Sequence, residues 1–296
     1  MRCLIVLLIT LTTAVVSSAQ QSDTDKMLRQ MVVSIVDGYP GFENGGSAII
    51  INTATGTYLV TATHIAKEVG IFGSIVFQDT TGKSLQVPLN EVFYEERGYL
   101  NRLLPIQSPE HSPHIFSITD MQIDGSLRGW VHHPSADLSA FKIDLEKLTL
   151  KVPFVFRWIS LSALPKKKEE ISLDGEFIAL GFPHLKGVAK QEILGSNSGY
   201  YYAAESLNPR PFLSRASKGF ENKTRGDVNV KQDFFFLIEQ NVPGDSGGPV
   251  FSITRPTSAN PNGRIDLVGI MHGFETSFPH RTAVTPISYL WDLISN

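Results

Sequence analysis

Residues 244–250 read Gly-Asp-Ser-Gly-Gly-Pro-Val and place a serine hydroxyl inside a glycine-rich segment. Glycine allows backbone conformations and close approaches that other residues forbid, so this segment suits neither an ordinary strand nor an ordinary helix. Such a loop can turn the hydroxyl of Ser246 outward while its own N–H groups face a substrate carbonyl, which is the arrangement that acyl transfer needs. The alternative is a glycine-rich hairpin turn without any chemistry.

The order of these seven residues resembles the nucleophile loop of trypsin/chymotrypsin-like serine proteases. A serine hydroxyl holds its proton tightly at neutral pH, so such a site needs a nearby base, most often a histidine. The chain has eight histidines. Among them His64 follows a strand-like run, and its Val-Thr-Ala-Thr-His context is similar to the histidine motif of that family. The resemblance therefore implies that His64 is the base.

A third group, a carboxylate, should hold the imidazole in the right tautomer and stabilise it once it is protonated. The segment 133–143 resembles the family stretch in which an aspartate, here Asp137, precedes an apolar strand. By spacing alone, an aspartate that caps a turn explains Asp137 equally well. The rival acids, which lack the same lead-in and strand, are Asp120, Asp124 and Asp144. The order His64, Asp137, Ser246 is that of chymotrypsin and differs from the orders of subtilisin and the α/β-hydrolases.

The resemblance also implies roles for neighbouring residues. The main-chain N–H groups of Gly244 and Ser246 would form the oxyanion hole. Gln240 would lie at the base of the specificity pocket, with His272 and Gly273 along its wall. A neutral glutamine at the base argues against a strong preference for Lys or Arg. His272 could bind an acidic substrate side chain, and the alternative for it is a structural role.

In that family the acid before the nucleophile, here Asp245, receives the N-terminal amine that is freed when the zymogen is cleaved. The segment that begins at Ile35 resembles such a new N-terminus, but Ser34 before it offers no tryptic cleavage site. The spacing from Ile35 to His64 is also short. We therefore expect Ile35 to lie in an early strand, which leaves the partner of Asp245 open.

Between these motifs, short apolar runs alternate with turn residues, as in 47–51, 57–61, 75–77, 177–180 and 234–238. β-Branched and aromatic residues dominate the runs, which is typical of strands. The family resemblance implies an all-β fold: two antiparallel six-stranded β-barrels with the active site in the cleft between them. We expect the first barrel over 34–150 and the second over 151–296, with a short C-terminal helix at 287–294.

The first residues and the composition indicate an exported protein. Residues 1–19 combine Arg2, a short apolar run and a small-residue end, the layout of a signal peptide, and residues 20–33 would form a leader. We expect a secreted or periplasmic protein with no stable membrane anchor. The net charge of −3 indicates no nucleic-acid partner. The single cysteine, Cys3, lies in the signal segment, and a mature chain without disulfides favours a bacterial-type member of the family.

The sequence predicts a secreted serine endopeptidase that hydrolyses a protein or peptide substrate through His64, Asp137 and Ser246 and an acyl-enzyme intermediate. No cofactor is expected, and no metal, since no His/carboxylate grouping has the spacing of a metal site. Two alternatives stay open. The chain could be a catalytically inactive family member that acts as a binding module, or an esterase-type hydrolase, since the same triad cleaves esters.

Overall fold

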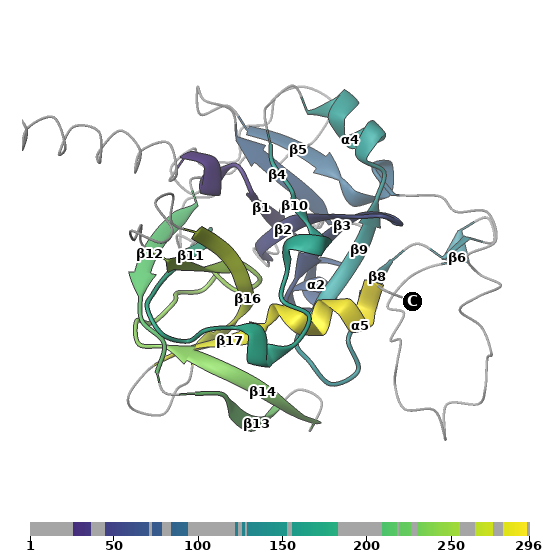
Figure 1. Ribbon diagram of the computed structural model, residues 1–296. Helices are drawn as coiled ribbons and strands as arrows, with labels where there is room; N and C mark the ends of the chain where they lie inside the picture. Colours follow the sequence, from purple (N-terminus) through teal and green to yellow (C-terminus); the bar gives the residue numbers. More distant parts are fainter. Residues whose placement is uncertain are drawn as a thin grey trace, which may run out of the picture.

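The structure is a computed structural model. It describes residues 26–36, 45–70, 73–78, 84–93, 122–123, 126–127, 129–152, 156–182, 209–217, 219–225, 230–254, 264–274 and 281–294. The expected signal peptide, residues 1–19, lies outside these ranges. Strands account for most of the regular structure in the described residues, as the sequence predicts. Figure 1 shows the purple, blue and teal strands of the N-terminal half on one side and the green strands of the C-terminal half on the other.

The first sheet contains six antiparallel strands in the order β5-β4-β1-β2-β3-β9. Their bounds are β1 (Val32–Val36), β2 (Gly45–Thr53), β3 (Gly56–Thr61), β4 (Ser74–Gln78), β5 (Ser84–Pro88) and β9 (Ser139–Ile143). An isolated bridge between Phe93 and Ile143 joins the chain that follows β5 to β9, which closes the six strands into a barrel. Two short strands extend this sheet: β8 (Trp130–His132) pairs with β9, and β10 (Ile159–Ser160) pairs in parallel with β2.

The second sheet repeats this plan with six antiparallel strands in the order β12-β11-β15-β16-β17-β14. Their bounds are β11 (Glu176–Gly181), β12 (Arg210–Ser214), β14 (Val230–Leu237), β15 (Pro249–Thr254), β16 (Arg264–Phe274) and β17 (Thr282–Pro286). A bridge between Ala216 and Leu237 connects the end of β12 to β14 and closes this barrel. β13 (Glu221–Arg225) pairs with β14 outside the ring. A separate ribbon pairs β6 (Gln122–Ile123) with β7 (Ser126–Leu127). The expectation of two antiparallel six-stranded barrels is confirmed.

Helices are short and lie between strands or at the end of the chain. Among the described residues they include α2 (Thr63–Val69), α4 (Leu145–Lys151) and α5 (Leu290–Ile294), and residues 26–29 form a helical turn ahead of β1. The 3-10 turns include η1 (Leu89–Glu91), η2 (Leu161–Ala163), η3 (Lys168–Glu170) and η5 (Ile287–Tyr289). α4 starts at Asp144, whose carboxylate accepts the N–H groups of Glu146 and Lys147 as an N-cap. Together η5 and α5 form the short C-terminal helix that the sequence predicts. Within the described ranges no helix has the length and apolar character needed to cross a membrane.

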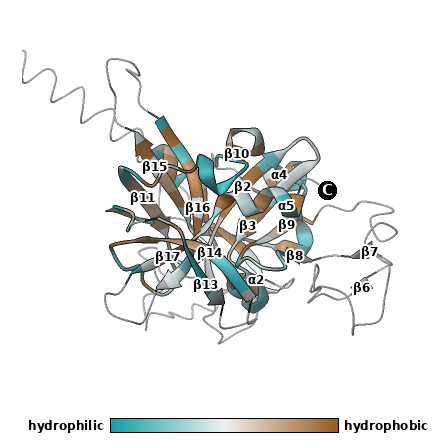
Figure 2. Ribbon diagram, turned by 60° about the horizontal axis from the view of Figure 1, so that its bottom comes forward, coloured by the Kyte–Doolittle hydropathy of each residue, from teal (hydrophilic) through white to brown (hydrophobic). Residues whose placement is uncertain are grey.

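The apolar core has three parts, one inside each barrel and one where the barrels meet. Phe141 is buried inside the first barrel and Phe235 inside the second. The third part joins residues of both sheets to the terminal helix, including Val60, Phe251 and Leu290. Figure 2 shows hydrophobic residues along β2, β3 and β16, in the middle of the molecule. Burial of this shared apolar surface stabilises the docked pair of barrels.

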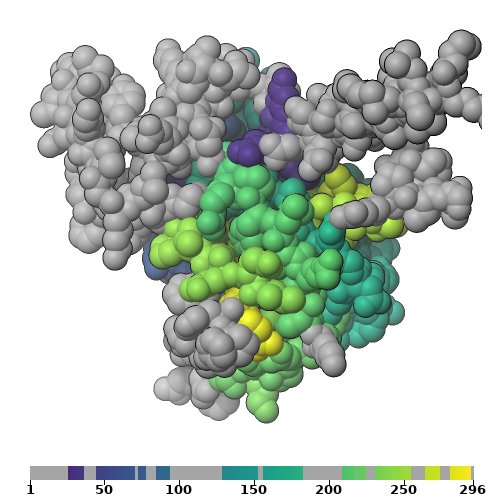
Figure 3. Space-filling view, turned by 90° about the vertical axis from the view of Figure 1, so that its left-hand side faces the viewer, coloured from purple at the N-terminus to yellow at the C-terminus, as the bar shows by residue number. Residues whose placement is uncertain are grey.

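The structure describes the chain on both sides of the two expected segment boundaries. Leu28, in the expected leader, is buried against the shared core, and Arg29 donates a hydrogen bond to the carbonyl of Pro209 (2.6 Å). Figure 3 shows this purple N-terminal segment against the green second barrel. Strand β1 begins at Val32, before the expected residue 34. At the other boundary, Val152 is buried in the first core and β10 pairs with β2, so the chain stays with the first barrel beyond residue 150, through Ser160.

Ser47, on β2, connects the first barrel to the glycine-rich loop of the second. Its hydroxyl donates to the carbonyl of Gly244 (2.9 Å) and accepts the N–H of Phe182 (2.8 Å). Its own N–H donates to the carbonyl of Ser246 (2.8 Å). Gly247 has a φ of +83° there, and a Cβ on it would lie 2.0 Å from the hydroxyl oxygen of Thr61. The loop therefore fits against the first barrel only with glycine at this position.

Replacing Ser47 with alanine tests this connection. Ser47→Ala leaves the buried carbonyl of Gly244 and the N–H of Phe182 without their partner, and we expect a loss of about 1–3 kcal/mol in the free energy of unfolding. Urea unfolding followed by tryptophan fluorescence measures it. The control is Ser162→Ala, an exposed serine whose hydroxyl bonds only to the exposed Ser160, which should change stability by less than about 0.5 kcal/mol. Equal effects of the two substitutions would contradict the proposed connection.

Candidate active site

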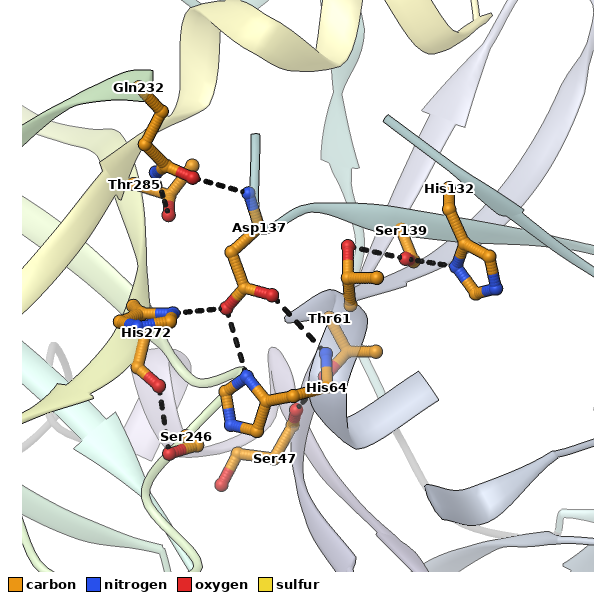
Figure 4. Close-up of polar contacts among 11 residues, drawn as sticks. Ser47, Thr61, His64, His132, Asp137, Ser139, Gln232, Ser246, His272 and Thr285 are labelled. Carbon is orange, nitrogen blue, oxygen red and sulfur yellow. Dashed lines mark hydrogen bonds and ion pairs between the residues drawn. The ribbon is translucent and has the colours of Figure 1, made fainter. Parts of the chain in front are cut away.

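His64 lies where β3 turns into α2, as the sequence predicts. The strand ends at Thr61, Ala62 is still extended, and His64 is the second residue of the helix. Its Nδ1 lies 2.9 Å from Oδ2 of Asp137, and its main-chain N–H donates to Oδ1 of the same carboxylate (3.2 Å). Two bonds thus fix His64 on an acid 73 positions away, and its side chain keeps 31% exposure to solvent. Figure 4 shows the ring between Asp137 and Ser246.

Asp137 lies two residues before β9 and has no exposed surface. Its main-chain N–H donates to the side-chain oxygen of Gln232 (2.7 Å), and the side-chain nitrogen of Gln232 donates to the hydroxyl of Thr285 (3.0 Å). Gln232 and Thr285 belong to β14 and β17 of the second barrel. The second barrel therefore holds the backbone at Asp137, while His64 of the first barrel contacts its carboxylate.

The carboxylate of Asp137 is charged. Burial alone would raise its pKa, but hydrogen bonds from His272 and then His64 outweigh burial and hold the pKa well below its usual range. An ionised carboxylate only accepts hydrogen bonds, so the Nδ1 atom that faces it carries the proton in each ring. In a neutral His64 the Nε2 atom is then an unprotonated lone pair, which is what a general base requires.

Ser246 lies in the turn between β14 and β15, and its hydroxyl donates to the main-chain carbonyl of His272 (3.2 Å; Figure 4). The N–H of Gly247 donates to the carbonyl of Met271 (2.8 Å), which ties the loop to β16. Gly244 has a φ of +92°, a conformation that favours glycine. Within the part of the chain that the structure describes, the N–H groups of Gly244 and Ser246 donate to no protein atom. Both donors are thus available to a substrate oxygen.

The structure shows a partner for Asp245, which the sequence left open. Asp245 is fully buried, and its Oδ2 accepts hydrogen bonds from the guanidinium of Arg210 (2.8 Å) and the N–H of Val242 (2.9 Å). Ile35 lies inside β1, paired with Gly46 and fully buried, as expected of an early strand. The cation that bonds to Asp245 therefore belongs to a side chain at the start of β12.

The three residues expected around the specificity pocket lie in different settings. Gln240 is exposed after the end of β14, whereas the next residue, Asn241, is 1% exposed. Gly273 lies beside the serine, since a Cβ on it would be 4.0 Å from Oγ of Ser246. The side chain of His272 is directed at Asp137. A role for Gln240 at the pocket base stays a prediction.

The contact of His272 with Asp137 is the main feature of the site that sequence reasoning missed. His64, Asp137 and His272 each offer a ligand-type atom, and these atoms lie within 4.8 Å of one another. Sequence spacing could not show this group, because His272 follows Asp137 by 135 positions. Both Nδ1 atoms are hydrogen-bonded to the carboxylate, which accounts for the cluster without a metal ion. Arg210 and Gln232 were missed for the same reason, since no local motif marks either of them.

Comparison with known proteins gave matches among solved structures. A scan against models of protein families and a search of curated proteins found no match. Among solved structures, the chain is similar to the MamO protease domain from Magnetospirillum magneticum, with 13% identity and a TM-score of 0.49 over 91% of this chain and 98% of that one. It is also similar to the HtrA-type protease AlgW with a tripeptide, with 15% identity and a TM-score of 0.49 over 93% of this chain and 62% of that one.

A further similar structure is the serine endoprotease from Yersinia pestis, with 13% identity and a TM-score of 0.44 over 91% of this chain and 63% of that one. The assignment of the fold rests on the topology of the chain itself. Two antiparallel six-stranded barrels meet at a site to which the first contributes His64 and Asp137 and the second contributes Ser246. The chain therefore has the fold of trypsin/chymotrypsin-like serine proteases.

Proposed function

We propose that this protein is a serine endopeptidase in which Ser246 is the nucleophile, His64 the general base and Asp137 the residue that orients His64. The observation that carries the proposal is the contact of 2.9 Å between Nδ1 of His64 and the buried, ionised carboxylate of Asp137. This contact leaves Nε2 as the basic atom of a ring that Figure 4 draws between Asp137 and Ser246.

The proposed reaction begins when the hydroxyl of Ser246 leaves the carbonyl of His272 and attacks the scissile carbonyl of a bound peptide. Nε2 of His64 takes the hydroxyl proton, and the carboxylate of Asp137 stabilises the imidazolium that forms. His64 then gives the proton to the leaving amine as the peptide C–N bond breaks. A water molecule next attacks the acyl group and loses a proton to His64, which returns that proton to Ser246 as the acyl–serine bond breaks. The N–H groups of Gly244 and Ser246 stabilise the oxyanion, and one such donor contributes roughly 10²–10³ in rate.

The salt bridge between Arg210 and Asp245 supports activity without N-terminal processing. A freed N-terminal amine would have to displace the guanidinium, and Ile35 is held within β1 by pairing with β2 and β4. We infer that Arg210 holds the loop of Ser246 in place as soon as the chain folds. The proposal includes export through residues 1–19, whose composition is that of a signal peptide.

One test of the proposed function concerns the nucleophile. Ser246→Ala should lower peptidase activity by about 10⁶ if the three residues act as a unit. Hydrolysis of casein and of a peptide library by the purified protein measures this loss. The variant should also lose covalent labelling by a fluorophosphonate probe. Wild-type turnover in Ser246→Ala would refute the assignment.

The same assays separate the alternatives. A wild-type protein that neither reacts with the probe nor cleaves any substrate would be an inactive binding module. Hydrolysis of small esters without hydrolysis of casein or peptides would identify an esterase. A library profile dominated by cleavage after Lys or Arg would contradict the inference from Gln240.

Another test of the proposed function concerns Arg210. Arg210→Met leaves the buried carboxylate of Asp245 without its cation, and we expect a loss of about 1.5–3 kcal/mol in the free energy of unfolding, toward the lower end because the Arg210 side chain is 42% exposed. Arg210→Lys keeps the charge and should recover part of this loss. Urea unfolding measures the stability, and peptide hydrolysis measures the matching loss of activity. An enzyme that becomes active only after cleavage before Ile35 would contradict the role given to Arg210.

A further inference from the structure

Asp137 is bonded by two histidines, and the mechanism proposed above uses only one of them. Nδ1 of His272 lies 2.5 Å from Oδ2, the same oxygen that Nδ1 of His64 contacts at 2.9 Å. The two rings meet edge to face, with centroids 5.4 Å apart and an interplanar angle of 82°. Figure 4 shows them approaching the carboxylate from different sides. The shorter of the two contacts belongs to His272, whose ring has no role in the reaction proposed above.

His272 is fixed in this position by its surroundings. The ring of Phe234, on β14, lies 5.2 Å from its ring, centroid to centroid. Its strand, β16, pairs with β15 and β17, and the main-chain carbonyl of His272 accepts the hydroxyl of Ser246. One residue therefore contacts Asp137 through its side chain and Ser246 through its main chain. An acidic substrate side chain would have to compete with Asp137 for Nδ1.

A carboxylate without solvent contact needs several hydrogen-bond donors to stay ionised, because burial disfavours its charged form. In this site Oδ1 accepts the main-chain N–H of His64, and Oδ2 accepts the two ring N–H groups. If the ring of His272 lost its donor, Oδ2 would lose the shorter of its two ring hydrogen bonds. The carboxylate could then gain a proton or turn about its Cβ–Cγ bond, and either change weakens its bond to His64.

We propose that His272 is a positioning residue: its ring N–H holds the Asp137 carboxylate in the charged form and in the orientation that His64 needs to act as base. This inference rests on the proposed function. It gives His272 a role in turnover, whereas a wall residue of the specificity pocket would act on the choice of substrate.

Two substitutions of similar size test the proposal. His272→Asn keeps an amide N–H close to the place of Nδ1, and His272→Leu has no donor. A hydrogen bond to a charged group contributes about 1.5–3 kcal/mol, so we expect His272→Leu to lower kcat by roughly 10- to 100-fold with KM unchanged. His272→Asn should recover most of the lost turnover. Circular dichroism and thermal unfolding show whether both variants are folded, and the asparagine variant keeps the test decisive if the leucine variant is not.

A double-mutant cycle shows whether His272 acts through His64. In a His64→Ala background, His272→Leu should cause no further loss, because the group that it positions is already absent. Proton NMR gives a readout independent of activity: the wild-type protein should show two strongly downfield ring N–H signals, and His272→Leu should show one.

Three results would overturn the proposal. Equal losses in His272→Leu and His272→Asn would show a packing role alone. A loss confined to KM for substrates with an acidic side chain would show the specificity role. Full activity in His272→Leu would show that the second bond does not matter. Each of these is distinct from failure of the proposed function, in which Ser246→Ala would keep the wild-type activity.

Discussion

The burial of one charged carboxylate links the fold of this protein to its site. Asp137 has no exposed surface, and an ionised group in such a place is stable only where enough donors surround it. Its donors come from α2 of the first barrel and β16 of the second, while β14 of the second barrel accepts its main-chain N–H. Neither barrel alone supplies this environment. The charged form of Asp137, and with it the basicity of His64, therefore depends on the docking of the two barrels.

The same principle applies on the other side of the site. Asp245 is also fully buried, and it receives the guanidinium of Arg210 and the N–H of Val242. Ser47 reaches the same loop from the first barrel and bonds to the carbonyls of Gly244 and Ser246. The serine loop is thus held by Arg210 of its own barrel and by Ser47 of the first barrel. A conformation with positive φ at two glycines is maintained by these contacts, since the loop has no regular hydrogen-bond ladder of its own.

The parts of this structure that could be predicted from the sequence are those with a local signature. The turn from strand to helix before His64, the strand after Asp137 and the short terminal helix each follow from neighbouring residues. The two six-stranded barrels followed from the family resemblance. The alternation of apolar residues marks a strand but does not identify its partner, so the periodicity alone leaves the topology open.

Contacts between distant residues could not be predicted in the same way. Ser47 and Gly244 are 197 positions apart, and Asp137 and His272 are 135 apart. Even the pair of Arg210 and Asp245, 35 positions apart, depends on β12 and the serine loop lying at the same end of the second barrel. A lone arginine at the start of a strand is most often a solvated surface group. These residues come into contact only when the barrels close, and barrel closure depends on many strand pairings at once.

The two histidines on Asp137 show how a shared contact can produce different functions. Both rings donate Nδ1–H to the same oxygen, so the carboxylate does not distinguish them chemically. Their backbones do. His64 begins a helix and brings its ring beside Ser246, whereas His272 lies on a strand and meets Ser246 with its main-chain carbonyl (Figure 4). In the proposed reaction the ring of His64 exchanges a proton with the Ser246 hydroxyl, and the ring of His272, which packs against Phe234, holds the Asp137 carboxylate in place.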